Sequence, residues 1–415
     1  MLTGIVPFAL YTHLAHTDLT LAKFALLGAL AGLLSARSPR EALATLRRGI
    51  GAPMLYALAA VAAVAAISIA VAAYPAEALR QTLKAGQFLL LFAVTALLAK
   101  DDAEPAVLAA AASTLAVALA AIAQLWSGAP SAMPLLGGIV PRVAGPLEGP
   151  NQLSAFLDVA LPLILAHALR PSQEKARSAL YLAALGAGCA ALLLTFSRAG
   201  ILTAALALLV VVLWGRHATA SSRNAPAAAG ALGVLTGLAL TAYAVARARI
   251  GTSWHLLSLP SAIFGRTDTT YVGSIGTRSQ LWHAATALWV RHKLLGVGAG
   301  NFELELERVG LHGIRTHANS AYLQALAETG IVGLAVQLAL VLASILPYAR
   351  RARASALCAG VAAGSIALAL HGVVDTLTFF EKVGQFWICV CALPAARAGP
   401  ALQDKKRQGD DTRRR

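Results

Sequence analysis

The chain has 415 residues, of which 58% are hydrophobic and 13% are charged, with a formal net charge of +15. Soluble domains carry about 25% charged residues, so this composition excludes a soluble globular protein. Many apolar runs reach the roughly 20 residues that a helix needs to cross a bilayer, and no alternating ten-residue segments suggest a membrane barrel. The sequence therefore predicts an all-α, polytopic membrane protein.

Twelve membrane-spanning helices are expected, of which the first is short and carries His13 and His16. In chain order the expected spans are 2–17, 19–35, 54–74, 80–99, 105–126, 152–169, 178–196, 199–214, 226–246, 320–347, 355–373 and 378–396. The chain thus divides into nine helices (1–246), a large polar loop (247–319), three helices (320–396) and a charged tail (397–415).

The positive charge has two readings, nucleic-acid binding or loops that fix membrane topology, and in this chain we favour the second. More than half of the 34 Lys and Arg residues fall in alternate loops and in the tail. This asymmetry predicts that both termini are cytoplasmic and that the 247–319 loop faces the outer side. The four cysteines lie inside apolar runs without zinc-ligand spacing, which predicts buried free thiols.

Several cations on the predicted outer side are not explained by topology, and an anionic ligand there would explain them. They are Arg142, Arg198, Arg266, Arg278, Arg291, Lys293, Arg308 and Arg315, with Arg80 and Lys84 at the end of a span. The sharpest candidate is Arg198, because it lies in a four-residue break between two apolar runs, at the membrane edge. Ionisable residues at such depth are functional candidates, and arginine binds phosphate through a bidentate fork; the alternative is a snorkelling anchor.

His317 lies one turn before the tenth predicted span, with Asn319 or Ser320 expected as the N-cap. A histidine there can act as a general base near neutral pH, or simply cap the helix. Gln324 and Glu328 fall on the same helix face as His317, and a structural hydrogen bond is the preferred role for Glu328.

The polar loop is expected to contain an amphipathic helix over 277–293 that lies on the membrane surface or packs on the spans, followed by a glycine-rich turn at 296–300. Arg266 and Arg278 flank a Thr-rich stretch, and their spacing does not choose between them. No HExxH motif or carboxylate pair with metal-ligand spacing occurs on the predicted outer side. A metal is therefore not implied, and arginines would have to neutralise a bound phosphate.

Four segments in fixed order resemble the O-antigen ligase and polymerase superfamily of bacterial inner membranes. They are RVAGPLEGPNQ at 142–152, LTFSRAG at 194–200, LLGVGAGNF at 294–302 and HANSAYLQALAETGIVGL at 317–334. The resemblance implies an O-antigen ligase with a periplasmic active site, which transfers glycan from undecaprenyl pyrophosphate to a sugar hydroxyl of lipid A–core. The implied reaction is inverting and needs neither metal nor cofactor.

The resemblance also implies residue roles. His317 matches the family's essential histidine, taken as the base, and Arg198 matches its essential arginine. The second essential arginine is best matched by Arg266, with Arg278 as runner-up. We count Arg198, Arg266, Arg278, Arg142 and Asn319 as the predicted substrate-binding residues.

Three alternatives stay open. A repeat-unit polymerase or a protein O-oligosaccharyltransferase would use the same donor with another acceptor. A transporter of polyprenyl-linked glycans is more distant, because the sequence lacks paired, interrupted spans in two halves.

Overall fold

The computed structural model describes residues 4, 11–14, 17–36, 38–129, 131–135, 138–170, 174–215, 272–378 and 380–397. The described elements are β1 (Tyr11–Leu14), β2 (Thr17–Thr20), α2 (Leu21–Ala36), α3 (Pro39–Arg48), α4 (Ala52–Ser68), α5 (Pro75–Leu98), α6 (Glu104–Ser127), β3 (Ser131–Leu135), β4 (Gly138–Arg142), α7 (Pro150–Ala168), α8 (Lys175–Leu194), α9 (Arg198–Gly215), α12 (Val272–Arg291), α13 (Phe302–Glu305), the 3₁₀ helix η3 (Leu306–Val309), α14 (Ala321–Ala349), α15 (Ala356–His371) and α16 (Glu381–Ala392).

Six of the described helices, α5, α6, α7, α8, α9 and α14, are long and apolar enough to cross a membrane. Three shorter apolar helices, α2, α4 and α15, accompany them. The protein is therefore a multi-pass membrane protein, as the sequence predicted, although a total of twelve spans is not confirmed. The predicted span at 226–246 lies outside the described residues.

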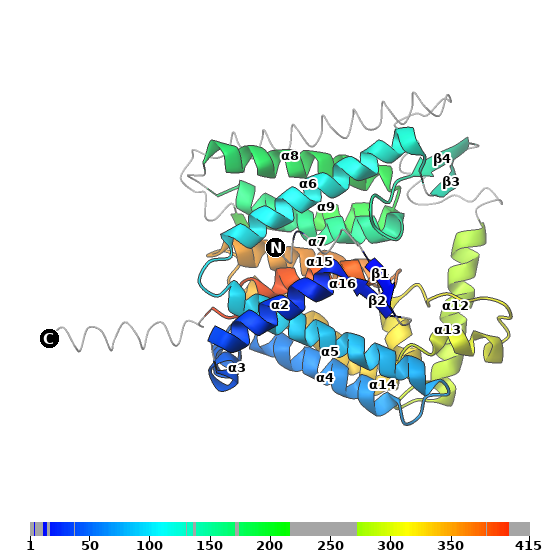
Figure 1. Ribbon diagram of the computed structural model, residues 1–415. Helices are drawn as coiled ribbons and strands as arrows, with labels where there is room; N and C mark the ends of the chain where they lie inside the picture. The colour runs from blue at the N-terminus through cyan, green and yellow to red at the C-terminus, as the bar shows by residue number, and fades with distance from the viewer. Residues whose placement is uncertain are drawn as a thin grey trace.

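The helices form three groups that run side by side (Figure 1). Helix α7 lies in the middle group with α15 and α16, flanked by α6, α8 and α9 on one side and by α4, α5 and α14 on the other. In its most apolar stretch, 83% of the residues of α7 are buried, more than in any other of the six long helices. Helix α7 is thus the central helix of the described bundle.

Two glycines on α15 explain why it packs so tightly against α7. A Cβ atom added at Gly360 would come 2.6 Å from Cα of Leu163, and one added at Gly364 would come 3.1 Å from Cα of Val159. Glycines four residues apart on one helix let two backbones approach closely, which is a main source of helix association in membranes. Helices α7 and α15 are therefore a closely packed pair.

Helix α14 is broken at Gly330, which has φ 67° and ψ −162°. The break is filled by the glycine-rich turn that precedes α13. Gly298 N donates to the carbonyl of Glu328 (2.8 Å), and Ile331 N donates to the carbonyl of Lys293 (3.0 Å). The turn predicted at 296–300 is thus confirmed, and it is bound to the first half of α14 by backbone hydrogen bonds.

Helix α12 confirms the helix predicted over 277–293, although it begins earlier, at Val272. It lies across the ends of the spans rather than along them (Figure 1). Leu281, Ala285 and Leu288 are buried in a small apolar cluster with Val297 and Phe302. Packing on the bundle, one of the two expected roles, is therefore what the structure shows.

Two β-hairpins were not predicted. The expected first span, 2–17, is wrong at its C-terminal end, because Tyr11–Leu14 pairs with Thr17–Thr20 as an antiparallel hairpin. That segment is shorter than a bilayer requires and is rich in Thr and His, which favour a surface strand over a lipid-embedded helix. The loop expected at 127–150 contains the hairpin of β3 and β4, in which Ser131 pairs with Arg142.

Candidate functional site

The elements that carry the described site residues have the relevant ends at one end of the bundle, where α12 and the β3–β4 hairpin lie (Figure 1). We call it the α12 end. Arg142 ends β4, Arg198 begins α9, Arg278 lies on α12, and His317 and Asn319 lie in the segment before α14. Arg266 lies outside the described residues. The site is therefore built from segments that are far apart in the sequence.

Arg142 joins two of these segments. Its Nε donates to the carbonyl of Thr195 (2.7 Å), three residues before Arg198, and its Nη2 donates to Oδ1 of Asn151 (2.8 Å). The backbone N–H of Val143 adds a bond to the carbonyl of Leu194 (3.2 Å). The half-buried guanidinium of Arg142 thus fixes the loop that presents Arg198.

Asp375 joins that loop to the segment that carries His317. Asn151 Nδ2 donates to Oδ2 of Asp375 (2.7 Å), and the other carboxylate oxygen accepts the backbone N–H of Thr376 (2.8 Å). The hydroxyl of Thr376 then accepts the backbone N–H of Ser320 (3.1 Å). We name Arg142, Asn151, Asp375 and Thr376 the polar brace, because they connect the starts of α7, α9 and α14.

Strained backbone occurs at both predicted site segments. Among the described residues, Phe196 and Asn319 are the two non-glycine residues with positive φ, both at 50°. Asparagine tolerates this left-handed conformation, whereas a bulky residue such as phenylalanine does so at a cost of about 1–3 kcal/mol. Such strain is concentrated at functional sites, and here it precedes Arg198 and follows His317.

Asn319 also holds α12 against the site. Its carbonyl accepts the indole N–H of Trp282 (3.3 Å). Ser320, the next residue, caps α14 by accepting the N–H of Leu323 (3.4 Å). The structure thus assigns the N-cap to Ser320, one of the two residues expected for that position.

His317 contacts a carboxylate that the sequence did not single out. Its Nδ1 lies 2.6 Å from Oε1 of Glu303 on α13, and the ring of Phe380 packs edge-on against the imidazole with centroids 5.5 Å apart. The hydrogen bond with His317 lowers the pKa of Glu303, partial burial opposes this shift, and Arg315 adds to it. Glu303 is therefore ionised beside the histidine at neutral pH.

A side chain of α14 holds the backbone next to His317. Ala318 N donates to Oε1 of Gln324 (2.7 Å), whose amide donates to Glu328 (2.5 Å). Glu328 also accepts the backbone N–H groups of Gly300 and Phe302. The structural role preferred for Glu328 is therefore supported by its contacts.

A cavity of about 200 Å³ lies next to this segment, between α4, α5, α14 and α16. Two of its lining residues, Gln324 and Thr376, are the side chains that hold the backbone of Ala318 and Ser320. Most polar lining residues lie near the starts of α5 and α14, close to the segment that carries His317, and the apolar ones lie farther along the helices. The polar lining comprises Gln81, Lys84, Gln324, Glu328, Thr329, Gln337, Thr376 and Thr378, and the apolar lining includes Leu58, Val61, Phe88, Leu340 and Ile388. The cavity is thus amphipathic.

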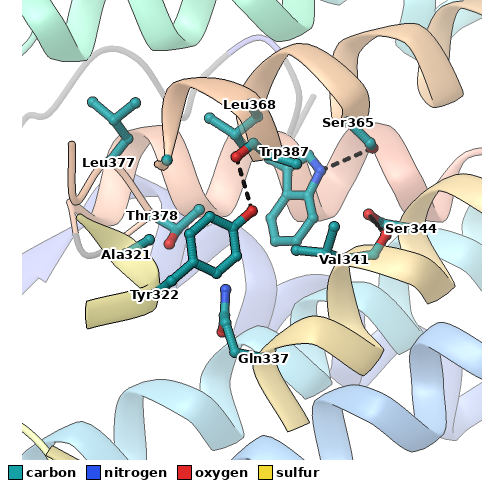
Figure 2. A pocket seen from close by; sticks show the side chains of 12 residues that line it. Ala321, Tyr322, Gln337, Val341, Ser344, Ser365, Leu368, Leu377, Thr378 and Trp387 are labelled. Atoms are coloured by element: carbon teal, nitrogen blue, oxygen red, sulfur yellow. Dashed lines mark hydrogen bonds between the residues drawn. The ribbon is translucent and has the colours of Figure 1, made fainter. Parts of the chain in front are cut away.

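A second pocket, of only about 20 Å³, shares Ala321, Gln337, Thr378 and Trp387 with this cavity (Figure 2). Its walls are fixed by hydrogen bonds from Tyr322 to the carbonyl of Ala369 (2.8 Å) and from the Trp387 indole to Ser365 (3.1 Å). The lining of both pockets leads from polar groups near His317 into the apolar bundle, as an amphipathic ligand requires.

Most predicted residues are therefore brought into one network, but not all. The structure joins Arg142, the Arg198 loop, Asn319 and His317, whereas Arg278 lies half-buried on α12. Sequence reasoning missed Glu303 and Asp375. An aspartate directly after an apolar span was a usable signal for Asp375, because carboxylates at a membrane edge are seldom placed there without a partner.

A family model of known proteins matches the part of the chain that contains most of these residues. Residues 182–338 match the family model described as O-antigen ligase. The matched range includes Arg198, Arg278, Glu303, His317 and Asn319. No curated protein matches the chain significantly. Among the described residues, no three His, Cys, Asp or Glu side chains are grouped closely enough to hold a metal ion.

Proposed function

We propose that this protein, in which residues 182–338 match the family model described as O-antigen ligase, is an enzyme of that family and moves O-antigen polysaccharide from undecaprenyl pyrophosphate to a sugar hydroxyl of lipid A–core. The family is of the ligase and polymerase type of glycosyltransferase. In this proposal the α12 end faces the periplasm, and both termini are cytoplasmic. The observation that carries it is His317, held against Glu303 beside the polar brace and above an amphipathic cavity.

The arrangement supports an inverting displacement. The acceptor hydroxyl attacks the anomeric carbon, the bond from that carbon to the pyrophosphate oxygen breaks, and the hydroxyl proton passes to His317. Undecaprenyl pyrophosphate leaves with the developing negative charge. Fixed arginines stabilise that charge in a partly dry site, and we assign this role to Arg198 with Arg266 or Arg278. Neither a metal nor a cofactor is required in these steps.

Arg142 takes a different part in the proposal from the one predicted. Two of its guanidinium nitrogens contact Thr195 and Asn151. We therefore propose that it positions the Arg198 loop, and that any contact with the donor is secondary. Asn319, whose strained backbone lies between His317 and the cap of α14, sets the direction in which the histidine enters the site.

The cavity supports a lipid-linked donor. Its polar lining lies next to the segment that carries His317, and its apolar lining extends between spans. A pyrophosphate headgroup and a hydrocarbon chain need the same two environments. The donor can therefore lie with its anomeric carbon near the histidine while its chain stays within the bundle.

A complementation experiment tests the proposal. His317→Ala and Arg198→Ala are expected to leave a ligase-deficient strain without polymer on lipid A–core, while both proteins insert in normal amounts. His312→Ala is the matched control, because His312 is an exposed histidine in the same loop. Normal ligation by His317→Ala would show that the assigned base is wrong.

The same strain distinguishes the alternatives within the family. Polymer that accumulates on its lipid carrier in the deletion strain indicates a ligase. Single repeat units attached to lipid A–core indicate a polymerase, and normal lipopolysaccharide indicates a protein O-oligosaccharyltransferase.

A further inference from the structure

Glu303 is placed to control His317, although no sequence motif suggests it. Its Oε1 lies 2.6 Å from Nδ1 of the imidazole, and both side chains are partly exposed. A carboxylate at one ring nitrogen keeps the hydrogen on that nitrogen and leaves the other as the basic lone pair. The contact therefore selects Nε2 of His317 as the atom that can take a proton.

The backbone around Glu303 is fixed before any substrate arrives. Asn301, two residues earlier, is buried, and its Oδ1 accepts the N–H of Tyr74 at the start of α5 (2.8 Å). Phe302 is fully buried, and its N–H donates to Glu328 on α14. Since α14 also holds the backbone of Ala318 through Gln324, both members of the pair are positioned by one helix.

The imidazole is confined on two sides. Glu303 faces its Nδ1, and the Phe380 ring packs edge-on against it. The charged groups that act on this pair are Glu303 on α13, Glu328 on α14 and Arg315 in the preceding loop. The neighbouring acid, Glu305, is occupied by Arg308 at 2.8 Å. Glu303 is thus the carboxylate in direct contact with the histidine.

We propose that Glu303 is a positioning residue for the transfer reaction, which fixes the tautomer and orientation of His317 and stabilises the imidazolium formed when the acceptor hydroxyl is deprotonated. This inference rests on the proposed function. Proton balance is simple: the hydroxyl proton moves to Nε2, Nδ1 keeps its own hydrogen, and Glu303 stays ionised throughout. Release of the Nε2 proton to solvent resets the site.

Removing the carboxylate has two expected effects. An ionised partner stabilises the protonated imidazole, so Glu303→Gln is expected to make His317 a weaker base. The acid limb of the pH–rate profile then moves to lower pH. At the same time kcat falls about 10²-fold with little change in KM, because the imidazolium loses its support and the tautomer is no longer fixed. A merely structural role would not move the acid limb.

The decisive experiment does not depend on activity. The rate at which diethyl pyrocarbonate acylates His317 in the purified full chain is measured by mass spectrometry as a function of pH, since the reagent attacks neutral imidazole. The midpoint for His317 is expected to fall in Glu303→Gln and to stay unchanged in Glu307→Gln, the exposed acid of the neighbouring 3₁₀ helix. His312 provides an internal reference.

An unchanged His317 midpoint in Glu303→Gln would overturn the inference. A lowered midpoint with the wild-type transfer rate and profile would overturn it as well, because the pair would then exist without serving the reaction. If instead His317→Ala transfers glycan normally, the proposed base is wrong, and the acylation midpoint still reports whether Glu303 controls the histidine. The two failures are therefore distinguishable.

Discussion

Two histidine–carboxylate pairs occur among the described residues, with similar Nδ1–oxygen distances and different surroundings. In the first, Nδ1 of His317 lies 2.6 Å from Glu303, and the two side chains are 17% and 30% exposed. In the second, Nδ1 of His371 lies 2.7 Å from Asp158, and the side chains are 1% and 0% exposed. Contact chemistry alone therefore does not identify a catalytic pair, because only the first can be reached by a substrate.

The buried pair connects three helices of the bundle. Asp158 on α7 also accepts the hydroxyl of Thr203 on α9 (3.1 Å), and His371 ends α15. A Cβ atom added at Gly200, two residues after Arg198, would contact both Ser154 and His371. The pair therefore lies close to the start of α9 and connects the helices that carry the polar brace, whereas the accessible pair is the one we propose to act on the substrate.

The largest expected effect is a loss of protein stability, and it tests whether the buried pair has a structural role. Asp158→Ala leaves His371 buried without its carboxylate, which costs about 3–5 kcal/mol. Thermal unfolding of the purified protein in detergent measures this loss. The double replacement of Asp158 by Leu and His371 by Phe removes both polar groups and is expected to recover much of it. Loss of transfer by Asp158→Ala protein that is still folded would contradict a purely structural pair.

Arg198→Ala is expected to have the next largest effect, and on activity rather than on folding. Loss of one fixed group that stabilises transition-state charge lowers turnover about 10²- to 10³-fold. Arg198→Lys keeps the charge but not the fork, so it recovers only part of the rate. Arg291→Ala is the control, because Arg291 is an exposed arginine at the end of α12. Equal losses in both variants would argue against a specific role.

Asn151→Ala tests the polar brace, with a smaller expected effect. It removes the partner of both Arg142 and Asp375, which costs about 1–3 kcal/mol of stability for the groups left without a bond. Transfer should fall about tenfold, or about 1.4 kcal/mol, as the Arg198 loop loosens. Gln152→Ala, at the next position, is the comparison. Unchanged stability and transfer would show that the brace does not hold the site.

Gly330→Ala tests the turn that carries Glu303, and its expected effect is similar or smaller. An alanine at φ 67° is strained by about 1–3 kcal/mol, and its Cβ would collide with the carbonyl of Leu294. Gly86→Ala is the matched control, because Gly86 lies within α5 with open space around it. That change should stabilise the protein by up to about 1 kcal/mol. Hydrogen exchange of residues 294–303 reports whether the turn loosens.

The sequence predicted the spans best where apolar runs are long and uninterrupted, as in α5 to α9. It also singled out Arg198 and His317, because a short break between spans and the start of a span are visible locally. The prediction of a span at 2–17 failed at its C-terminal end, where 11–14 and 17–20 pair as a hairpin instead. The break in α14 was hidden, since Gly330 alone does not distinguish a kink from a tolerated glycine.

Residues that act through contacts with distant parts of the chain could not be identified from the local sequence. Asn151 and Asp375 are 224 positions apart, so their hydrogen bond cannot be seen from spacing. Glu303 follows a glycine-rich turn, and its meaning appears only once that turn is bound at the break in α14. A helix or a motif is a local property, whereas a network depends on how the helices are packed.

The central claim is that the accessible pair, and not the buried one, serves glycan transfer. Its most direct test is the rate of product formation by purified His317→Ala and by the apolar Asp158/His371 double variant, each in vesicles that contain undecaprenyl-pyrophosphate-linked glycan and lipid A–core. We predict a loss of about 10²- to 10⁴-fold for His317→Ala and a near wild-type rate for the folded double variant. Wild-type transfer by His317→Ala would contradict the claim.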